Sequence, residues 1–186
     1  TSADTAGDPA QVVGYASILV TADDTRLYTP DQRRHLCDVA FHAMGTPLGR
    51  KAAPPKAPAG DLAWLNRPAA AFVTLHLEGA LRGCIGTTEP VYPLGAAVAH
   101  FATAAAFHDP RFPPVTLPEL DRLDWSISVL SLPEPFPVAS RAELERRLRP
   151  GVHGLVLESG WRKATFLPSV WEELPSPSMF VGALLR

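Results

Sequence analysis

An excess of either charge is missing from this chain. Its 186 residues include 17 basic and 19 acidic side chains, which leaves a formal net charge of -2. Proteins that bind nucleic acid or an anionic membrane through their overall electrostatic field need a clear positive surplus. The sequence therefore argues against nucleic acid and against a membrane surface as partners.

Cysteine is nearly absent, and long apolar runs are absent. Cys37 and Cys84 are the only cysteines, so there is no disulfide framework, and their wide separation matches no zinc-binding pattern. We therefore expect no metal, no cofactor and a reducing cytoplasmic setting. The longest apolar run, residues 94–107, is shorter than the roughly 20 residues of a membrane-spanning helix, and the N-terminus does not resemble a secretory signal.

Apolar residues are abundant enough for one well-buried core, since 46% of the chain is hydrophobic. A capping box predicts a helix that starts at Thr29, has Pro30 in its first position and Gln32 opposite the cap, and ends at Gly45. The proline-rich run at 50–60 predicts a loop.

Strand signals alternate with helical ones along the rest of the chain. Residues 70–85 read as a hairpin that turns at Gly79-Ala80, and a second helix is expected from a cap at Thr88 to Phe107. Further expected elements are a strand at 125–132, a short helix capped by Ser140, a hairpin at 155–166 turning at Ser159-Gly160, and a helical turn at 168–174. This order predicts an α+β fold.

The most informative stretch is LRGCIG, residues 81–86. Strand alternation places Arg82 and Cys84 on one face, about 6 to 7 Å apart, where the guanidinium favours the thiolate. Gly83 and Gly86 allow a ligand or another backbone to approach closely. The amides near Thr87 and Thr88, at the expected helix start, suit an anionic group.

A structural interpretation of the same stretch stays open. Cys84 can be a small buried hydrophobe, Arg82 can pair with a carboxylate such as Glu89 or Asp109, and the glycines can serve packing. The His108–Phe112 segment is open in the same way. Its imidazole and carboxylate suit acid-base work, whereas Asp109 can instead cap the turn and Arg111 can bridge loop carbonyls.

Other polar groups favour structural roles. His35, Asp38 and His42 share a helix face with metal-compatible donors, but that face lies away from the apolar stripe, so a solvated polar flank is expected. Cys37 is expected to be packed. Acidic and basic residues four apart in 141–149 predict a salt-bridged surface, and His153 and Trp161 are expected to pack in the last hairpin.

The stretch LRGCIG, followed by TTEPVYPLGAAVAHFATAAAFHDPRFPPVT, resembles the AMMECR domain, the A component of the AmmeMemoRadiSam protein set. LDWSISVLSLPEPF and the C-terminal segment from GVHGLVLESGW also resemble that family, so the likeness extends from about Thr29 to the end. The resemblance implies a two-lobed fold, mainly antiparallel sheet with flanking helices, and a cleft near LRGCIG in which Asp109 and Arg111 take part. It also implies Memo-like and radical-SAM partners.

Two departures from the family pattern affect the domain boundaries. Family members usually continue beyond the last residues of this chain into a further strand, and the segment before Thr29 has no clear counterpart. We therefore expect a partly ordered extension at 1–28 and an AMMECR-type domain at 29–186 that lacks the family's last strand.

Two functions follow as hypotheses. The first is an enzyme or enzyme subunit that holds a small anionic substrate, with Cys84 as nucleophile or covalent carrier and Arg82 as thiolate stabiliser and anion clamp. Gly83, Gly86, Thr87, Thr88, Asp109 and Arg111 would line the binding site. The alternative is a noncatalytic adaptor or binding module for the Memo-like and radical-SAM partners.

Overall fold

The computed structural model describes residues 13–20, 28–130, 134–159 and 162–186. The chain forms two compact units, which we call the central unit (residues 20–132) and the terminal unit (residues 1–19 and 133–186). Both combine helices with antiparallel strands, so the α+β prediction is confirmed. No helix of the described residues is long and apolar enough to cross a membrane.

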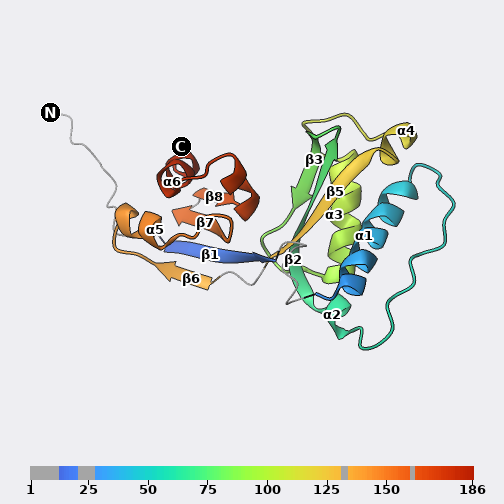
Figure 1. Cartoon of the computed structure of the whole chain (residues 1–186), viewed down its shortest axis with the longest axis horizontal. Helices are drawn as coiled ribbons and strands as arrows, with labels where there is room; N and C mark the ends of the chain where they lie inside the picture. Colours follow the sequence, from blue (N-terminus) through green and yellow to red (C-terminus); the bar gives the residue numbers. More distant parts are fainter. Residues whose placement is uncertain (1–12, 21–27, 131–133, 160–161) are drawn as a thin grey trace. The chain divides into compact units, whose positions relative to one another are not determined.

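The central unit contains the LRGCIG stretch. Its elements, coloured from blue to yellow in Figure 1, are α1 (Pro30–Gly45), α2 (Ala63–Asn66), β2 (Pro68–Leu77), β3 (Ala80–Gly86), β4 (Tyr92–Pro93), α3 (Leu94–Phe107), α4 (Leu117–Leu120) and β5 (Leu123–Leu130). Strand β2 lies between β3 and β5, both antiparallel to it, and its first residues also pair with β4. LRGCIG therefore lies in β3, at one side of β2.

The structure confirms the helix that the sequence predicts from Thr29 to Gly45. Thr29 caps α1, Pro30 occupies its first turn, and Gln32 completes the capping box through a hydrogen bond from the Thr29 amide to its side chain at 2.8 Å. Because the cap satisfies amides that have no partner within the helix, it defines the first turn locally. The helix ends at Gly45, as predicted.

The hairpin between β2 and β3 is confirmed, with its turn one residue earlier than expected. Glu78 and Gly79 both have positive φ, 54° and 81°, whereas Gly79-Ala80 had been expected. Positive φ at both central residues is the geometry of the tight turn that matches strand twist. The hairpin register also shifts between Leu75 and His76, so the strands contain an irregularity before they reach Cys84.

The predicted start of the second helix at Thr88 is wrong. Helix α3 starts at Leu94, after Tyr92 and Pro93 have paired with the beginning of β2. The residue before a proline is driven to extended backbone, which favours this short strand over helix before Pro93. The end at Phe107 is confirmed.

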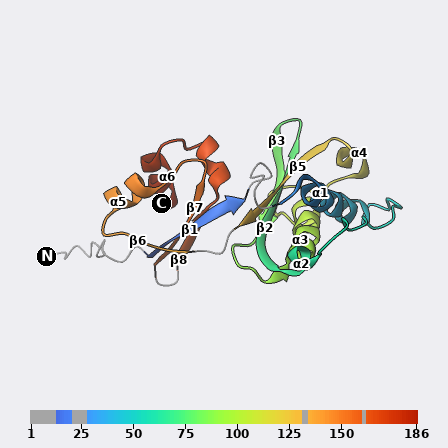
Figure 2. The ribbon, with the colours of Figure 1, turned by 60° about the horizontal axis from the view of Figure 1, so that its bottom comes forward.

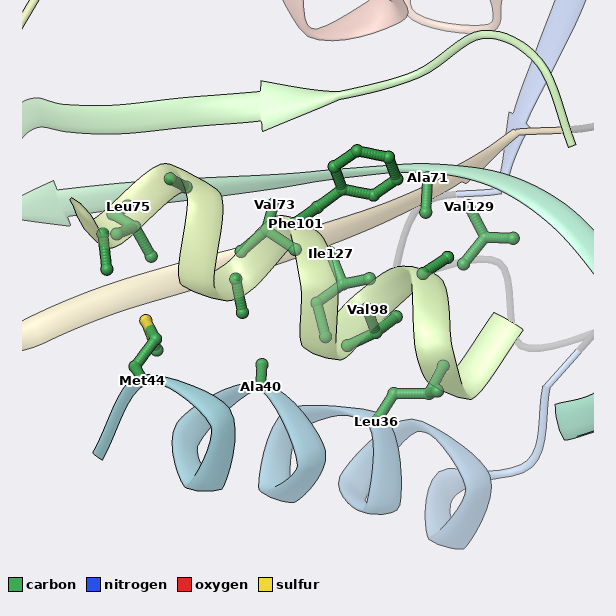
Figure 3. Close-up of a cluster of buried hydrophobic side chains, with 14 of the residues drawn as sticks. Leu36, Ala40, Met44, Ala71, Val73, Leu75, Val98, Phe101, Ile127 and Val129 are labelled. Carbon is green, nitrogen blue, oxygen red and sulfur yellow. The ribbon is translucent and has the colours of Figure 1, made fainter. Parts of the chain in front are cut away.

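The core of the central unit lies among α1, α3 and one face of the sheet (Figures 2 and 3). Met44 of α1, Val98 of α3, and Val73 and Leu75 of β2 are fully buried. Small residues such as Ala105 on α3 let this helix approach the sheet closely. The interface between them can therefore be as densely packed as protein interiors usually are.

The terminal unit has its own hydrophobic core. Its elements are β1 (Val13–Val20), β6 (Glu134–Pro137), α5 (Arg141–Arg147), β7 (His153–Ser159), β8 (Arg162–Phe166), the 3-10 helix η1 (Pro168–Glu172) and α6 (Pro177–Leu184). Strand β1 pairs with β6 and β7, and β7 pairs with β8, all antiparallel. In the core, Trp171 stacks on Phe180 at 3.9 Å and donates a hydrogen bond from its indole to the His153 carbonyl at 2.7 Å.

The sequence predictions for this unit succeeded in part. The hairpin, the helix capped by Ser140 and the turn at 168 are present, and His153 is buried against Phe136. The turn residue Gly160 and Trp161 lie outside the described residues. Helix α6 was missed, although Ser176 followed by Pro177 repeats the signal that opens α1.

Candidate functional site

The backbone of Cys84 is held at the edge of the sheet by the loop that follows α3. Its amide donates to the Asp109 carboxylate at 2.9 Å, and its carbonyl accepts from Arg111 Nη2 at 3.2 Å. Both polar groups of this β3 residue therefore point away from β2. Asp109 and Arg111 therefore supply hydrogen-bond partners for the Cys84 amide and carbonyl, which an edge strand would otherwise leave unpaired.

The same geometry places the thiol beside Thr74. Cys84 lies opposite Thr74 in the register of β3 and β2. Because the Cys84 backbone groups bond outward, the two residues form a non-hydrogen-bonded pair, in which side chains are closest. The Thr74 Oγ1 and the Cys84 Sγ are 3.2 Å apart, either one being able to donate.

The thiol lies on the sheet face away from α1 and α3. Val73 and Leu75, which flank Thr74 in β2, are buried against those helices (Figure 3). Alternation along a strand sends Thr74 to the other face, and its partner Cys84 with it. Both Thr74 and Cys84 are half-buried, so neither is sealed in the core.

Asp109 is the buried anchor of the site. Its side chain is 1% exposed, and its carboxylate forms a bidentate pair with Arg111 at 2.9 and 2.7 Å. The hydrogen bond from Arg111, with the Cys84 and Arg111 amides, holds the pKa of Asp109 well below its usual range although burial raises it. The pKa of Arg111 is raised, mainly by Asp109 and also by its Coulombic interaction with Cys84.

The expected pairing of Arg82 with Cys84 is absent. The register shift between β2 and β3 leaves Arg82 without a cross-strand partner, which interrupts the alternation that the prediction assumed. Arg82 is instead buried, donating to both carboxylate oxygens of Glu119 and to the carbonyls of Pro113 and Pro114. The carboxylate partner is thus Glu119, and neither Glu89 nor Asp109 takes that role.

Gly83 and Gly86 make room for the protein itself. A Cβ on Gly83 would lie 2.2 Å from the Ala105 carbonyl oxygen of α3, and one on Gly86 would lie 2.3 Å from both the Phe72 ring and the Ala71 carbonyl oxygen. Of the two open interpretations, close approach of another part of the chain is the one observed. The space beside each glycine is thus filled by the chain itself.

Thr87 and Thr88 are not at a helix N-terminus, because α3 starts later. The Thr87 hydroxyl accepts a hydrogen bond from the Glu89 amide at 3.1 Å, and its own amide donates to the Ala71 carbonyl. These contacts belong to a turn. The helix dipole expected to attract an anion here is therefore not available at these residues.

The structure thus brings together Cys84, Asp109 and Arg111 among the predicted site residues. Arg82 bonds instead to Glu119 and to the carbonyls of Pro113 and Pro114. Thr74 and Glu119 were not predicted from the sequence. Counted back from the turn at Glu78-Gly79, a regular hairpin would pair Cys84 with Val73, so only the register shift between Leu75 and His76 brings Thr74 opposite Cys84. The capping motif Thr116-Leu117-Pro118-Glu119 was visible, but nothing in it indicated Arg82.

The other candidate residues on α1, all within the described part of the chain, pack within the structure or lie outside any metal-binding cluster. The prediction of a solvated flank is wrong for His35, which is buried edge-on to the Trp64 ring. Cys37 packs against the core as expected, and burial, followed by the charge of Asp38, raises its pKa. Among the described residues, no cluster of His, Cys, Asp or Glu could hold a metal ion.

The salt-bridged surface predicted on α5 is present. Arg141 pairs with Glu145 at 2.6 Å, and Arg147 pairs with Glu143 at 3.4 Å. Arg149 contacts His153 instead of its expected acidic partner. These charges are therefore largely neutralised on their own helix.

Two pockets lie on the central unit beside α1. One, of about 150 Å³, is bounded by α1 and the loop from Arg50 to Pro55. The other, of about 520 Å³, lies next to the stacked rings of Phe41 and Trp125. Neither is lined by residues of LRGCIG.

Acid is expected to destabilise the fold through the carboxylates that brace this site. Hydrogen bonds from Arg82 lower the pKa of Glu119 to about 2, and the pKa of Asp109 is lowered as well. In the unfolded chain both return to about 4. The stability they supply is therefore complete above the unfolded pKa and is lost as the pH falls towards the folded values.

The expected result is a decline in the free energy of unfolding from about pH 5 down to about pH 2, measured by urea denaturation at several pH values. The Glu119→Gln variant should show a shallower decline over the same range. An equally steep decline in this variant would contradict the role given to Glu119.

Comparison with known proteins shows which protein family the chain resembles. A family model described as AMMECR1 matches residues 37–186. A protein of Methanothermobacter thermautotrophicus is 51% identical over 102 residues, covering 55% of this chain and 53% of that protein. A protein of Thermofilum pendens is 49% identical over 90 residues, covering 48% of this chain and 42% of its own length. The chain thus matches about half the length of these curated relatives.

A solved structure shows the same fold. The crystal structure of an uncharacterized protein, PH0010, from Pyrococcus horikoshii superposes with a TM-score of 0.71 at 35% sequence identity. The match covers 82% of this chain and 77% of that one.

Proposed function

Because the chain belongs to the AMMECR1 family, we propose that it is an enzyme or enzyme subunit in which the Cys84 thiol attacks a small electrophilic substrate. The observation that carries this proposal is the contact between the Cys84 thiol and the Thr74 hydroxyl on the sheet face away from the helices. In the proposed step, the thiol gives its proton to a base, the sulfur bonds to an electrophilic carbon, and the leaving group departs with its electron pair.

Arg111 replaces Arg82 as the proposed contact for an anionic substrate group. The Arg111 side chain is 53% exposed. Its Nε and Nη2 donate hydrogen bonds to Asp109. Nη1 makes no hydrogen bond within the described part of the chain. Because Arg111 also holds the Cys84 carbonyl, this nitrogen is fixed relative to the thiol. Asp109 neutralises much of the Arg111 charge. The proposed contact with the substrate therefore orients its anionic group more than it attracts it from a distance.

The test is selective alkylation of the two free cysteines in the native protein. Burial and Asp38 raise the pKa of Cys37, so little of it is thiolate at neutral pH. Iodoacetamide at pH 8 is expected to modify Cys84 at least about three-fold faster than Cys37. Peptide mass spectrometry over a time course measures both rates, with Cys37→Ser and Cys84→Ser as matched controls. Failure of Cys84 to react before denaturation would refute the proposal.

A docking role is the second candidate, and exposed apolar residues favour it. Val91, just before β4, is 60% exposed, and Tyr92, within β4, is 40% exposed. In this alternative the central unit binds the Memo-like or radical-SAM partners without chemistry of its own. A folded Cys84→Ser variant that loses partner binding would support docking, whereas retained binding with lost pathway activity would support catalysis. A reducing cytoplasm suits either role, because both cysteines are free thiols.

A further inference from the structure

The sheet face that carries Cys84 also carries an imidazole and a carboxylate. One row across the face is formed by Cys84, Thr74 and Ser126, in β3, β2 and β5. In the pairing of β2 with β5, His76 lies opposite Asp124 and forms the next row. A thiol, a hydroxyl, an imidazole and a carboxylate thus occupy neighbouring positions of one sheet.

Strand alternation places His76 on this face. Leu75 is fully buried against the helices, so Thr74 and His76 on either side of it project to the opposite face. Across β5, Leu123 is buried and Asp124 is exposed, which agrees with the same division. His76 is half-buried, and within the described residues its ring forms no hydrogen bond or ion pair. Both ring nitrogens are therefore available.

The spacing suits a proton transfer. Diagonal neighbours on adjacent antiparallel strands have Cα atoms roughly 7 to 8 Å apart, which long and aromatic side chains can bridge. Cys84 and His76 stand in this relation through Thr74. The Thr74 hydroxyl already contacts the thiol at 3.2 Å and lies two residues from His76 on the same strand face.

We propose that His76 is the general base for Cys84 and that Asp124 supports the imidazolium. The inference rests on the proposed function and deepens it. The thiol S–H bond breaks and an N–H bond forms on the imidazole, directly or through the Thr74 hydroxyl, which yields a thiolate and an imidazolium without change of net charge.

The other charges around His76 are paired. Glu78 and Arg122 form an ion pair at the hairpin end of β2 and β5, and Asp109 pairs with Arg111 at the edge of β3. Asp124 has no such partner within the described residues. It is therefore the uncompensated charge nearest in register to His76, and a negative neighbour favours the imidazolium.

The test measures the pH dependence of Cys84 alkylation in the full chain carrying Cys37→Ser. His76→Gln is expected to lower the iodoacetamide rate at pH 7 about five-fold and to leave it unchanged near pH 10, where the thiol ionises without help. Asp124→Asn should lower the pH 7 rate by a smaller factor. His100→Gln, on α3 and against Tyr92, is the matched control and should retain the parent rate.

The outcomes separate the two proposals. If Cys84 reacts in the parent protein but His76→Gln keeps the parent pH profile, the role of His76 is overturned and the proposed function stands. If Cys84 is unreactive in the native parent, both are overturned. Should His76→Gln fail to fold, the NMR titration of His76 in wild type and Cys84→Ser decides. A midpoint about 0.5 pH unit lower in the variant supports the pair, and an unchanged midpoint overturns it.

Discussion

Gly83→Ala is expected to lower the free energy of unfolding by about 3 kcal/mol. The new Cβ would lie 2.2 Å from the Ala105 carbonyl oxygen and 3.1 Å from its carbon. Both are backbone atoms of α3, so the clash cannot be relieved by rotating a side chain. Relief requires α3 to move away from β3, which would loosen the contacts of Val98 and Leu75 in the core. Urea denaturation followed by circular dichroism measures the loss.

Gly95→Ala is the matched control for this prediction. Gly95 lies in α3, and a Cβ there would meet only the Leu65 side chain, at 3.3 Å from Cδ2, and no backbone atom closer than 3.9 Å. Alanine also favours helix over glycine by up to about 1 kcal/mol. The control should therefore be neutral or mildly stabilising. Equal stability of Gly83→Ala and wild type would show that α3 does not approach β3 this closely.

Arg82→Met is expected to destabilise the fold by a similar amount, about 3 kcal/mol. The change removes the hydrogen bonds to Glu119, Pro113 and Pro114 and leaves a largely buried carboxylate without its cation. An uncompensated charge and unsatisfied carbonyls in a partly buried position both oppose folding. Thermal denaturation of the variant measures this effect. The Arg82→Met, Glu119→Gln double variant should recover part of the loss, because it removes the stranded charge.

Two controls distinguish a structural role of Arg82 from a role at the thiol. Arg34→Met removes a pair with Asp31 in which both side chains are at least 70% exposed, so it should change stability by less than about 1 kcal/mol. Under conditions where Arg82→Met remains folded, the Cys84 alkylation rate should match wild type. A markedly slower rate would return Arg82 to the role of thiolate stabiliser that strand alternation suggested.

The local signals in the sequence were reliable where each one acts within a few residues. Thr29, Pro30 and Gln32 together defined the start of α1, because a cap needs only its own first turn. The cap signal at Thr88 failed. There, pairing of Tyr92 and Pro93 with β2 competed with helix formation, and that competition involves residues more than twenty positions earlier in the chain.

The candidate site shows the same division. Cys84, Asp109 and Arg111 were named from the sequence, and the structure joins them through the Cys84 backbone. Arg82 was assigned to the thiol by assuming regular alternation, and one shift of register between β2 and β3 removed it. A bulge of this kind depends on how two strands pair, so the sequence of β3 alone contains no signal for it.

From its own residues, the chain determined an α+β fold, the cap of α1, the hairpin around Gly79 and the presence of a cysteine beside two glycines. Only the tertiary structure decided that Gly83 admits the backbone of α3, that Arg82 braces Glu119 and that Thr74 touches the thiol. Caps and turns are stabilised by neighbours in sequence, so their residues identify them. A side chain's direction and partners depend on register and on packing between distant segments, which become defined only when the sheet and helices come together.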